Sequence, residues 1–195
     1  MAIFHDLLTP EEMQFMQFSI MSEMKVSTVQ DITNPQGGAT KVTWERTQAS
    51  GWLWDEESEL LLSVSRRISA ATGLAAHSAL PPAEARYYDT AEPWQIGVYS
   101  PGGHYLPHHD DFDVLDPQAY TKTGTWVGNR AATAMAYLSH VEGEMIEYKR
   151  NNFNSFYHSG GFTAFPNIGV AARPQMGSVV FWYSLDTEGA RYAGL

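Results

Sequence analysis

The spacing of apolar residues predicts two helices in the first third of the chain. Thr9 and Glu12 form the pattern of a capping box with Pro10 at the first helical position, so we expect a helix that runs to about Met24. A second helix is expected over residues 55–73, because this segment begins with acidic residues, carries arginines late and stops at a glycine. Its apolar residues at helical spacing are Leu61, Val64 and Ile68.

Short runs of β-branched and aromatic residues predict strands elsewhere. Runs at 26–32 and 40–44 flank a loop rich in proline and glycine at 34–38, which favours a hairpin. Further strand-like runs are WQIGVY (94–99), HYLPHHDDF (104–112), ATAMAYLSH (132–140), FTAFP (162–166) and GSVVFWYSL (177–185). Short strands that follow two helices are typical of an α+β protein in which a β-sandwich or barrel packs against helices.

The pattern divides one domain, residues 1–195, into two regions. Residues 1–93 form a support region of helices and a hairpin, with a loop rich in proline and alanine at 75–93. Residues 94–195 form the strand-rich core. A polar and aromatic insertion at 142–159 interrupts this core, and we expect it to be a loop or lid at the mouth of the barrel.

Composition supports a compact domain and excludes several classes of protein. Hydrophobic residues make up 44% of the 195 positions. Acidic residues outnumber basic residues by 22 to 12 and the basic residues are scattered, so nucleic acid is not an expected partner. The chain has no cysteine, so any metal must be held by His, Asp or Glu. No apolar run is long enough for a membrane span, and the first residues lack the pattern of a signal peptide.

Histidines and aspartates are densest in the sequence YSPGGHYLPHHDDFD, residues 99–113. On a strand, residues two positions apart face the same way, so a His-x-Asp pair can bind one cation. Two registers compete, His108 with Asp110 and His109 with Asp111. Taken alone, this string is also compatible with a solvated acidic loop.

Alternation of apolar residues favours the first of these registers. Leu106 and Phe112 share a face with His108 and Asp110, so we assign this face to the interior of the barrel. A hydrolytic zinc site that uses adjacent histidines is disfavoured, because adjacent strand residues face opposite ways. The residues left outside the first coordination shell are His104, His109 and Asp111.

A His and a carboxylate from one strand, completed by a distal His, form the facial triad of non-haem Fe(II) oxygenases, which leaves positions open for oxygen and a keto acid. The sequence around the His-x-Asp pair carries an ordered series of motifs. They are FHDLLTPEE (4–12), ATGL (71–74), Tyr99 to Asp110, GNRAAT (128–133), YLS (137–139), GGFTAFP (160–166) and PQMGSVVFWYSL (174–185). Together they closely resemble the catalytic domain of collagen-type prolyl 4-hydroxylase α subunits over nearly the whole chain.

This resemblance implies a fold and an activity. The implied fold is a distorted double-stranded β-helix, or jelly roll, supported by the N-terminal helices. The implied cofactors are Fe(II) and 2-oxoglutarate, with ascorbate restoring over-oxidised iron. The implied reaction is hydroxylation of peptidyl-proline in a proline-rich or collagen-like substrate. The resemblance also implies location in the endoplasmic reticulum lumen and allows for a partner subunit.

The resemblance also implies roles for individual residues. His108 and Asp110 match two metal ligands of the family and are the expected catalytic residues. The residues that match positions lining the 2-oxoglutarate pocket are Tyr99 and Thr133. The residues that match positions near the peptidyl-proline are Tyr105 and Glu92.

The chain departs from the family pattern after the strand at 177–185. The family continues there to a distal iron-binding His and to a Lys that pairs with the far carboxylate of 2-oxoglutarate, and this chain has neither. We therefore expect a domain that lacks its C-terminal strand, with weakened iron binding. Remaining candidates are His140 or His158 as a third ligand and Arg173 or Arg191 as the carboxylate partner. The alternative function is a catalytically incomplete jelly-roll domain that binds peptide or a partner subunit without turnover.

Overall fold

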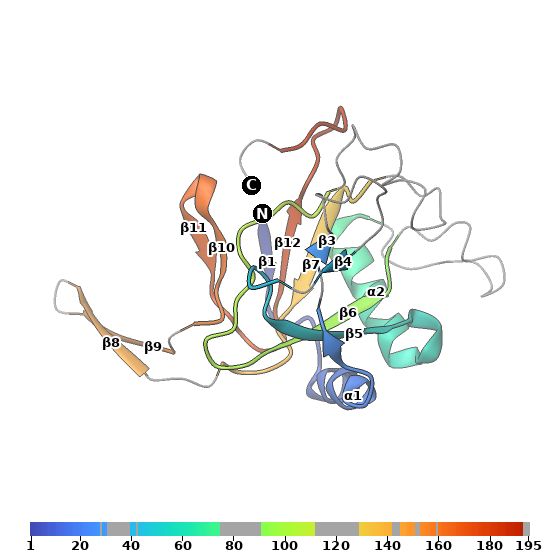
Figure 1. Cartoon of the computed structure of the whole chain (residues 1–195), viewed down its shortest axis with the longest axis horizontal. Helices are drawn as coiled ribbons and strands as arrows, with labels where there is room; N and C mark the ends of the chain where they lie inside the picture. Colours follow the sequence, from blue (N-terminus) through green and yellow to red (C-terminus); the bar gives the residue numbers. More distant parts are fainter. Residues whose placement is uncertain are drawn as a thin grey trace.

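The computed structural model describes the chain in nine stretches. They are residues 1–27, 29–30, 40–41, 43–74, 91–111, 129–141, 145–150, 153–158 and 160–192. Two helices, α1 (Pro10–Ile20) and α2 (Glu59–Thr72), pack against each other, and α1 also packs on two of the strands (Figure 1). No helix in these stretches has the length and apolar character that a membrane crossing needs.

Helix α1 begins as predicted and ends earlier than expected. The Thr9 hydroxyl accepts a hydrogen bond from the Glu12 amide at 3.3 Å, and the Glu12 carboxylate accepts one from the Thr9 amide at 2.8 Å, which completes the capping box. The helix ends at Ile20 rather than near Met24, because the chain must turn there to reach a short strand at Lys25–Val26.

Helix α2 confirms the second prediction. A short 3-10 helix, η1 (Asp55–Glu57), precedes it, and the Ser58 hydroxyl accepts a hydrogen bond from the Leu60 amide. Gly73 ends the helix with φ of 75°, a conformation that glycine adopts without steric cost.

In the described stretches, the strands form five antiparallel groups. One sheet has the order β1 (Ala2–Phe4), β12 (Val179–Tyr183), β7 (Ala132–Ala136), and a second has the order β2 (Lys25–Val26), β5 (Gln48–Leu53), β6 (Trp94–Tyr99). The pairs are β3 (Val29–Gln30) with β4 (Thr40–Lys41), β8 (Met145–Arg150) with β9 (Phe153–His158), and β10 (Thr163–Phe165) with β11 (Val170–Ala172). A second 3-10 helix, η2 (Pro166–Ile168), joins β10 to β11. This mixture of helices and antiparallel sheets agrees with the expected α+β class.

The hairpin expected near the start of the chain is present in part. Strands β3 and β4 pair as expected, whereas the loop at 34–38 lies outside the described residues. The first of the two expected strands is divided, since β2 pairs with β5 and only β3 pairs with β4. Most of the loop expected at 75–93 also lies outside the described residues.

One of the strand predictions in the second half of the chain is wrong. Residues 104–111 form a loop with a single β-bridge between Tyr105 and Arg46, and not a strand. Gly102 has φ of 78° just before this segment, and Pro107 has no amide hydrogen to donate to a ladder, so both residues oppose a continuous strand. The insertion at 142–159, expected to be a loop or lid, contains a hairpin in which β8 and β9 pair along their full lengths and extend away from the other strands (Figure 1), and its role as a lid stays a prediction.

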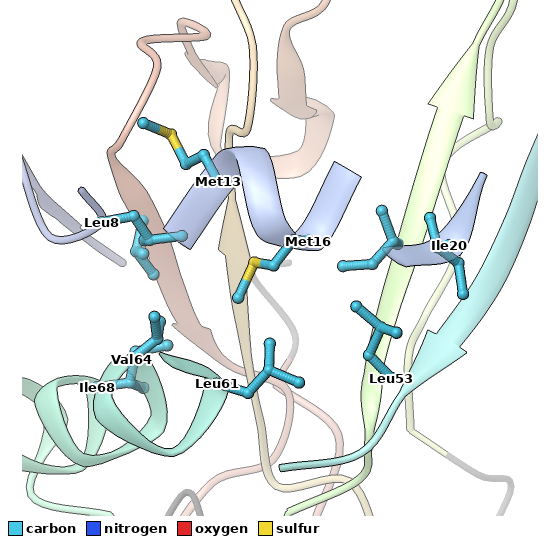
Figure 2. Packing of buried hydrophobic residues seen from close by; sticks show 10 residues of the cluster. Leu8, Met13, Met16, Ile20, Leu53, Leu61, Val64 and Ile68 are labelled. Carbon is cyan, nitrogen blue, oxygen red and sulfur yellow. The ribbon is translucent and has the colours of Figure 1, made fainter. Parts of the chain in front are cut away.

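The main core joins both helices to the sheets. Met16 from α1, Leu61 from α2 and Leu53 from β5 point toward one another (Figure 2). The buried members of this cluster are Leu8, Met13, Met16, Ile20, Leu53, Leu61, Val64, Ile68, Ile96 and Val179. Since Val179 lies on β12 and Ile96 on β6, the cluster fixes the two larger sheets relative to the helices.

A buried ion pair adds a polar link between the helices. Arg67 of α2 donates to the carboxylate of Glu12 on α1 and, through Nε, to the Leu7 carbonyl at 2.9 Å. Burial by itself raises the pKa of Glu12, but the hydrogen bonds from Arg67 and Thr9 outweigh it and lower the pKa below its usual value. Glu12 therefore remains ionised at neutral pH and supports both the capping box and the contact between the helices.

Gly51 of β5 leaves the room that helix α1 occupies. A Cβ at this position would lie 2.4 Å from Cγ1 and 2.6 Å from Cδ1 of Ile20, whose side chain is fully buried. We expect Gly51→Ala to lower the free energy of unfolding by about 1–3 kcal/mol, which is the usual cost of overpacking a core. Urea denaturation followed by circular dichroism measures this difference.

Gly97→Ala on the neighbouring strand β6 is the matched control. Its Cβ would lie 3.2 Å from the side chain of Gln48 at the closest, so a small adjustment of that side chain accommodates it. Equal losses of stability in the two variants would contradict the steric role assigned to Gly51.

Candidate metal centre

His108 and Asp110 line one wall of an open cavity of about 930 Å³. The cavity runs along the side of the molecule formed by β5 and the loop at 104–111. Other residues that line it are Arg46, Trp52, Trp54, Gln95, Tyr105 and Arg130. The residues singled out as metal ligands therefore border a space large enough for a bound molecule.

The His108 ring is oriented by a backbone carbonyl. Its Nδ1 lies 2.7 Å from the carbonyl oxygen of Leu106, and since a carbonyl can only accept, Nδ1 carries the proton. The second nitrogen, Nε2, lies 3.3 Å from Oδ1 of Asp110. This arrangement, in which one ring nitrogen is fixed by a hydrogen bond and the other faces a carboxylate, is typical of metal-binding histidines.

Asp110 is held from a neighbouring strand. The hydroxyl of Thr133 on β7 donates to Oδ2 of Asp110 at 2.6 Å, and Nη1 of Arg130 donates to the Asp110 backbone carbonyl at 3.2 Å. Burial raises the pKa of Asp110, but hydrogen bonds from His108 and Thr133 outweigh it and the pKa is lowered. Asp110 is therefore a carboxylate at neutral pH.

The electrostatics of His108 complement those of Asp110. Burial lowers the pKa of His108, but the hydrogen bonds with Asp110 and the Leu106 carbonyl, together with the Asp110 charge, outweigh it and the pKa is raised above its usual value. A cation that binds to Nε2 takes the place of a proton on that nitrogen, as is general for histidine ligands. The pair thus offers one nitrogen and one carboxylate that a divalent cation can share.

Tyr105 covers the His108 ring. The two rings are stacked, with centroids 3.6 Å apart and an angle of 18° between their planes. The guanidinium of Arg46 lies 4.7 Å from the centroid of the Tyr105 ring, in range for a cation–π contact. Tyr105, expected near the substrate, therefore also supports the candidate ligand His108.

Glu92 forms an ion pair beside the same site. Its two carboxylate oxygens accept hydrogen bonds from Nε and Nη2 of Arg130, at 2.5 and 2.9 Å. Because Arg130 also donates to the Asp110 carbonyl, one guanidinium joins the expected substrate residue Glu92 to the expected metal ligand.

Tyr99 lies on β6, directly opposite Gln48 on β5. With the Gln48 amide oriented so that its oxygen faces Arg46, its nitrogen donates to the Tyr99 hydroxyl. Burial is the main cause of a raised pKa at Tyr99, so this hydroxyl stays protonated at neutral pH. Of the two residues expected to bind 2-oxoglutarate, Thr133 contacts Asp110, whereas Tyr99 contacts the Gln48 side chain on the neighbouring strand β5.

The structure separates the two competing His-x-Asp registers. His109 Nδ1 lies 4.0 Å from Oδ1 of Asp111, and the Asp111 carboxylate is occupied by Arg191. The choice of His108 with Asp110 as metal ligands stays a prediction, and the strand alternation that led to it is absent. Within the described residues there is no group of three or more His, Asp or Glu side chains that could hold a metal ion.

Sequence reasoning missed the arginines that organise this site. Arg46 lies outside every motif, and Arg130 lies within the GNRAAT motif at 128–133 but was assigned no role. Arg191, considered as a partner for a ligand carboxylate, instead binds the side chain of Asp111.

A histidine and a carboxylate that lie two residues apart and line one cavity are two of the three residue types in the facial triad of non-haem iron oxygenases. Comparison with curated proteins shows which proteins the chain is similar to. It is 31% identical over 186 residues to prolyl 4-hydroxylase subunit alpha-1 of Mus musculus and 27% identical over 187 residues to prolyl 4-hydroxylase subunit alpha-2 of Caenorhabditis elegans. These alignments cover 95% and 96% of this chain, so the chain is similar to a part of prolyl 4-hydroxylase α subunits along nearly its whole length.

A solved structure has a similar fold. The viral collagen prolyl hydroxylase of Paramecium Bursaria Chlorella virus-1, solved as a 2OG complex, matches with a TM-score of 0.61 and 17% sequence identity over 99% of this chain and 82% of that chain. No family model matches the sequence. The chain spans 29% of the length of both curated relatives.

Proposed function

We propose that this chain is an Fe(II)- and 2-oxoglutarate-dependent dioxygenase domain that hydroxylates prolyl residues in peptides. The observation that carries this proposal is the convergence of His108 Nε2 and Asp110 Oδ1, 3.3 Å apart, at the edge of a large open cavity. The relationship to prolyl 4-hydroxylase α subunits supports the choice of reaction. The corresponding fold is a jelly roll, to which the antiparallel sheets β1–β12–β7 and β2–β5–β6 would contribute.

The residues present fit an iron ion as two of its ligands. The imidazole of His108 and the carboxylate of Asp110 are donors that Fe(II) accepts, and both are fixed by hydrogen bonds from outside the site. When bound, iron with 2-oxoglutarate and oxygen would supply the oxidising power that the reaction needs. Ascorbate would be the reductant that returns over-oxidised iron to Fe(II). Leu106 and Thr133 prepare the two ligands by fixing their orientation.

The remaining residues act on the organic ligands. Thr133, and Tyr99 with its protonated hydroxyl, would contact 2-oxoglutarate, while Tyr105 and Glu92 would line the path of the peptide. The cavity is also bordered by Trp52 and Trp54, whose exposed fractions are 43% and 45%. Exposed aromatic rings beside an open cavity suit an extended proline-rich chain, because proline packs well on aromatic faces.

The similarity to prolyl 4-hydroxylase α subunits also supports a substrate class, a compartment and a partner subunit. A collagen-like or other proline-rich peptide is the substrate class, and the endoplasmic reticulum lumen is the compartment in which such substrates are hydroxylated. A partner subunit is part of the same proposal.

Succinate release tests the proposed function. The natural protein that carries these residues should convert 2-oxoglutarate to succinate at a rate that increases when a peptide of Pro-Pro-Gly repeats is added, in the presence of Fe(II) and ascorbate. Mass spectrometry should show a gain of one oxygen on the peptide. Peptide binding without succinate would instead support a domain that binds proline-rich chains without turnover.

A further inference from the structure

The loop that carries His108 and Asp110 is fastened firmly where it begins. The His104 amide donates to the Thr47 hydroxyl at 2.8 Å, and the Thr47 amide donates to the His104 carbonyl at 2.9 Å. Two residues on, the Leu106 amide donates to the Glu45 carbonyl at 2.9 Å. These bonds lie before the ligands, so the position of the ligands depends also on how the far end of the loop is held.

At the far end, Asp111 is held by an arginine from the segment after β12. Both Nε and Nη2 of Arg191 lie 2.9 Å from Oδ2 of Asp111, and Nε lies 3.3 Å from Oδ1. The Asp111 side chain is only 4% exposed. An ion pair with one partner so well buried is costly to break, because the remaining charge is left without compensation.

The backbone of Arg191 is itself ordered by a compact turn. Arg191 forms a β-bridge with Leu185, and the Tyr192 amide donates to the Ser184 carbonyl at 2.9 Å. Within the turn, the Asp186 carboxylate accepts hydrogen bonds from the amides of Glu188 and Ala190, each at 2.9 Å. The guanidinium is therefore presented to Asp111 from a defined direction.

We propose that Arg191 is a positioning residue for the metal centre. Asp110 and Asp111 share one peptide bond, yet Asp110 is bonded to Thr133 and Asp111 to Arg191. With both side chains fixed, the peptide unit between them cannot rotate freely, and the carboxylate of Asp110 is kept facing His108. The proposal rests on the function proposed above for His108 and Asp110.

The test compares Arg191→Gln and Asp111→Asn with the double variant. We expect each single change to accelerate amide hydrogen exchange in residues 104–111 of the metal-free protein, with no change in helix α1. Each change should also weaken Mn(II) binding by about fivefold to tenfold, as measured by electron paramagnetic resonance. Removal of a direct partner of a metal ligand costs about 10–100-fold in affinity, and a smaller loss is expected here because Arg191 acts through Asp111. The double variant should be no worse than either single variant, because both remove the same contact.

Two further variants make the result interpretable. Arg191→Lys keeps the charge and should recover part of the Mn(II) affinity, and it replaces Arg191→Gln if the latter does not fold. Arg66→Gln is the control, since Arg66 lies on the surface of α2 with a 4.0 Å contact to Glu59, and it should change neither readout.

The outcomes separate this proposal from the proposed function. Normal exchange at 104–111 and normal Mn(II) affinity in Arg191→Gln would overturn the positioning role, as would acceleration of exchange that is equal throughout the chain. If the unaltered protein does not bind Mn(II), the metal centre itself is wrong, while the exchange measurement still decides whether Arg191 holds the loop.

Discussion

Asp110→Ala is expected to weaken Fe(II) or Mn(II) binding by more than about 100-fold. Removing a residue that only supports a metal ligand already costs about 10–100-fold in affinity, so loss of a ligand carboxylate should exceed that range. His108→Ala should have an effect of similar size, because Nε2 of His108 lies 3.3 Å from Oδ1 of Asp110 and one cation could bind both atoms. Isothermal titration with Mn(II), which is not oxidised during the experiment, measures both variants.

His109→Ala is the matched control for the metal centre. His109 is adjacent to His108 in sequence, and its Nδ1 is 4.0 Å from Asp111, a residue already paired with Arg191. Its removal should leave Mn(II) affinity within about twofold of the unaltered protein. If His109→Ala abolished binding and His108→Ala spared it, the assignment of the ligands would be reversed.

Leu61→Ala is expected to have the largest effect on stability. Leu61 is fully buried on α2 and points toward Met16 and Leu53 (Figure 2), so its truncation leaves a cavity between both helices and the sheet. Such substitutions cost about 2–5 kcal/mol. For a chain of this size, that loss lowers the midpoint of thermal unfolding by roughly 4–20 °C, which differential scanning calorimetry would record.

Leu60→Ala provides the comparison on the same helix. Leu60 is adjacent to Leu61 but only partly buried, so the same substitution should cost clearly less. Similar losses at the two positions would mean that the face of α2 assigned to the core is wrong.

Local sequence signals predicted the helices well. The capping box at Thr9 and the glycine at 73 both act within a few residues. The start of α1 and the end of α2 could therefore be located from the local sequence alone. The predicted end of α1 was wrong because the helix ends where the chain turns to let β2 pair with β5. The residues of β5 lie about 25 positions further along the chain, so no local sequence pattern indicates this pairing.

The metal centre shows a different limit of sequence reasoning. Alternation of apolar residues selected the His108 and Asp110 pair, but the segment is a loop whose shape depends on Thr47, Thr133 and Arg191. These partners come from distant parts of the chain, and each is a common residue with many other uses in proteins. The sequence therefore singled out the candidate ligands His108 and Asp110, but it did not predict the contacts that orient them.

The position of Arg130 between two groups has a thermodynamic consequence. The same guanidinium binds the carboxylate of Glu92 and the backbone carbonyl of Asp110. Under the proposed function, a peptide that drew Glu92 away from Arg130 would change the surroundings of Asp110, and so would change the affinity for a cation there. Since coupling between two sites is reciprocal, occupation by the cation must alter the affinity for that peptide by the same factor. The binding of the peptide and the binding of the cation are then coupled. An order of binding can arise from this coupling without a conformational change such as the closing of a lid.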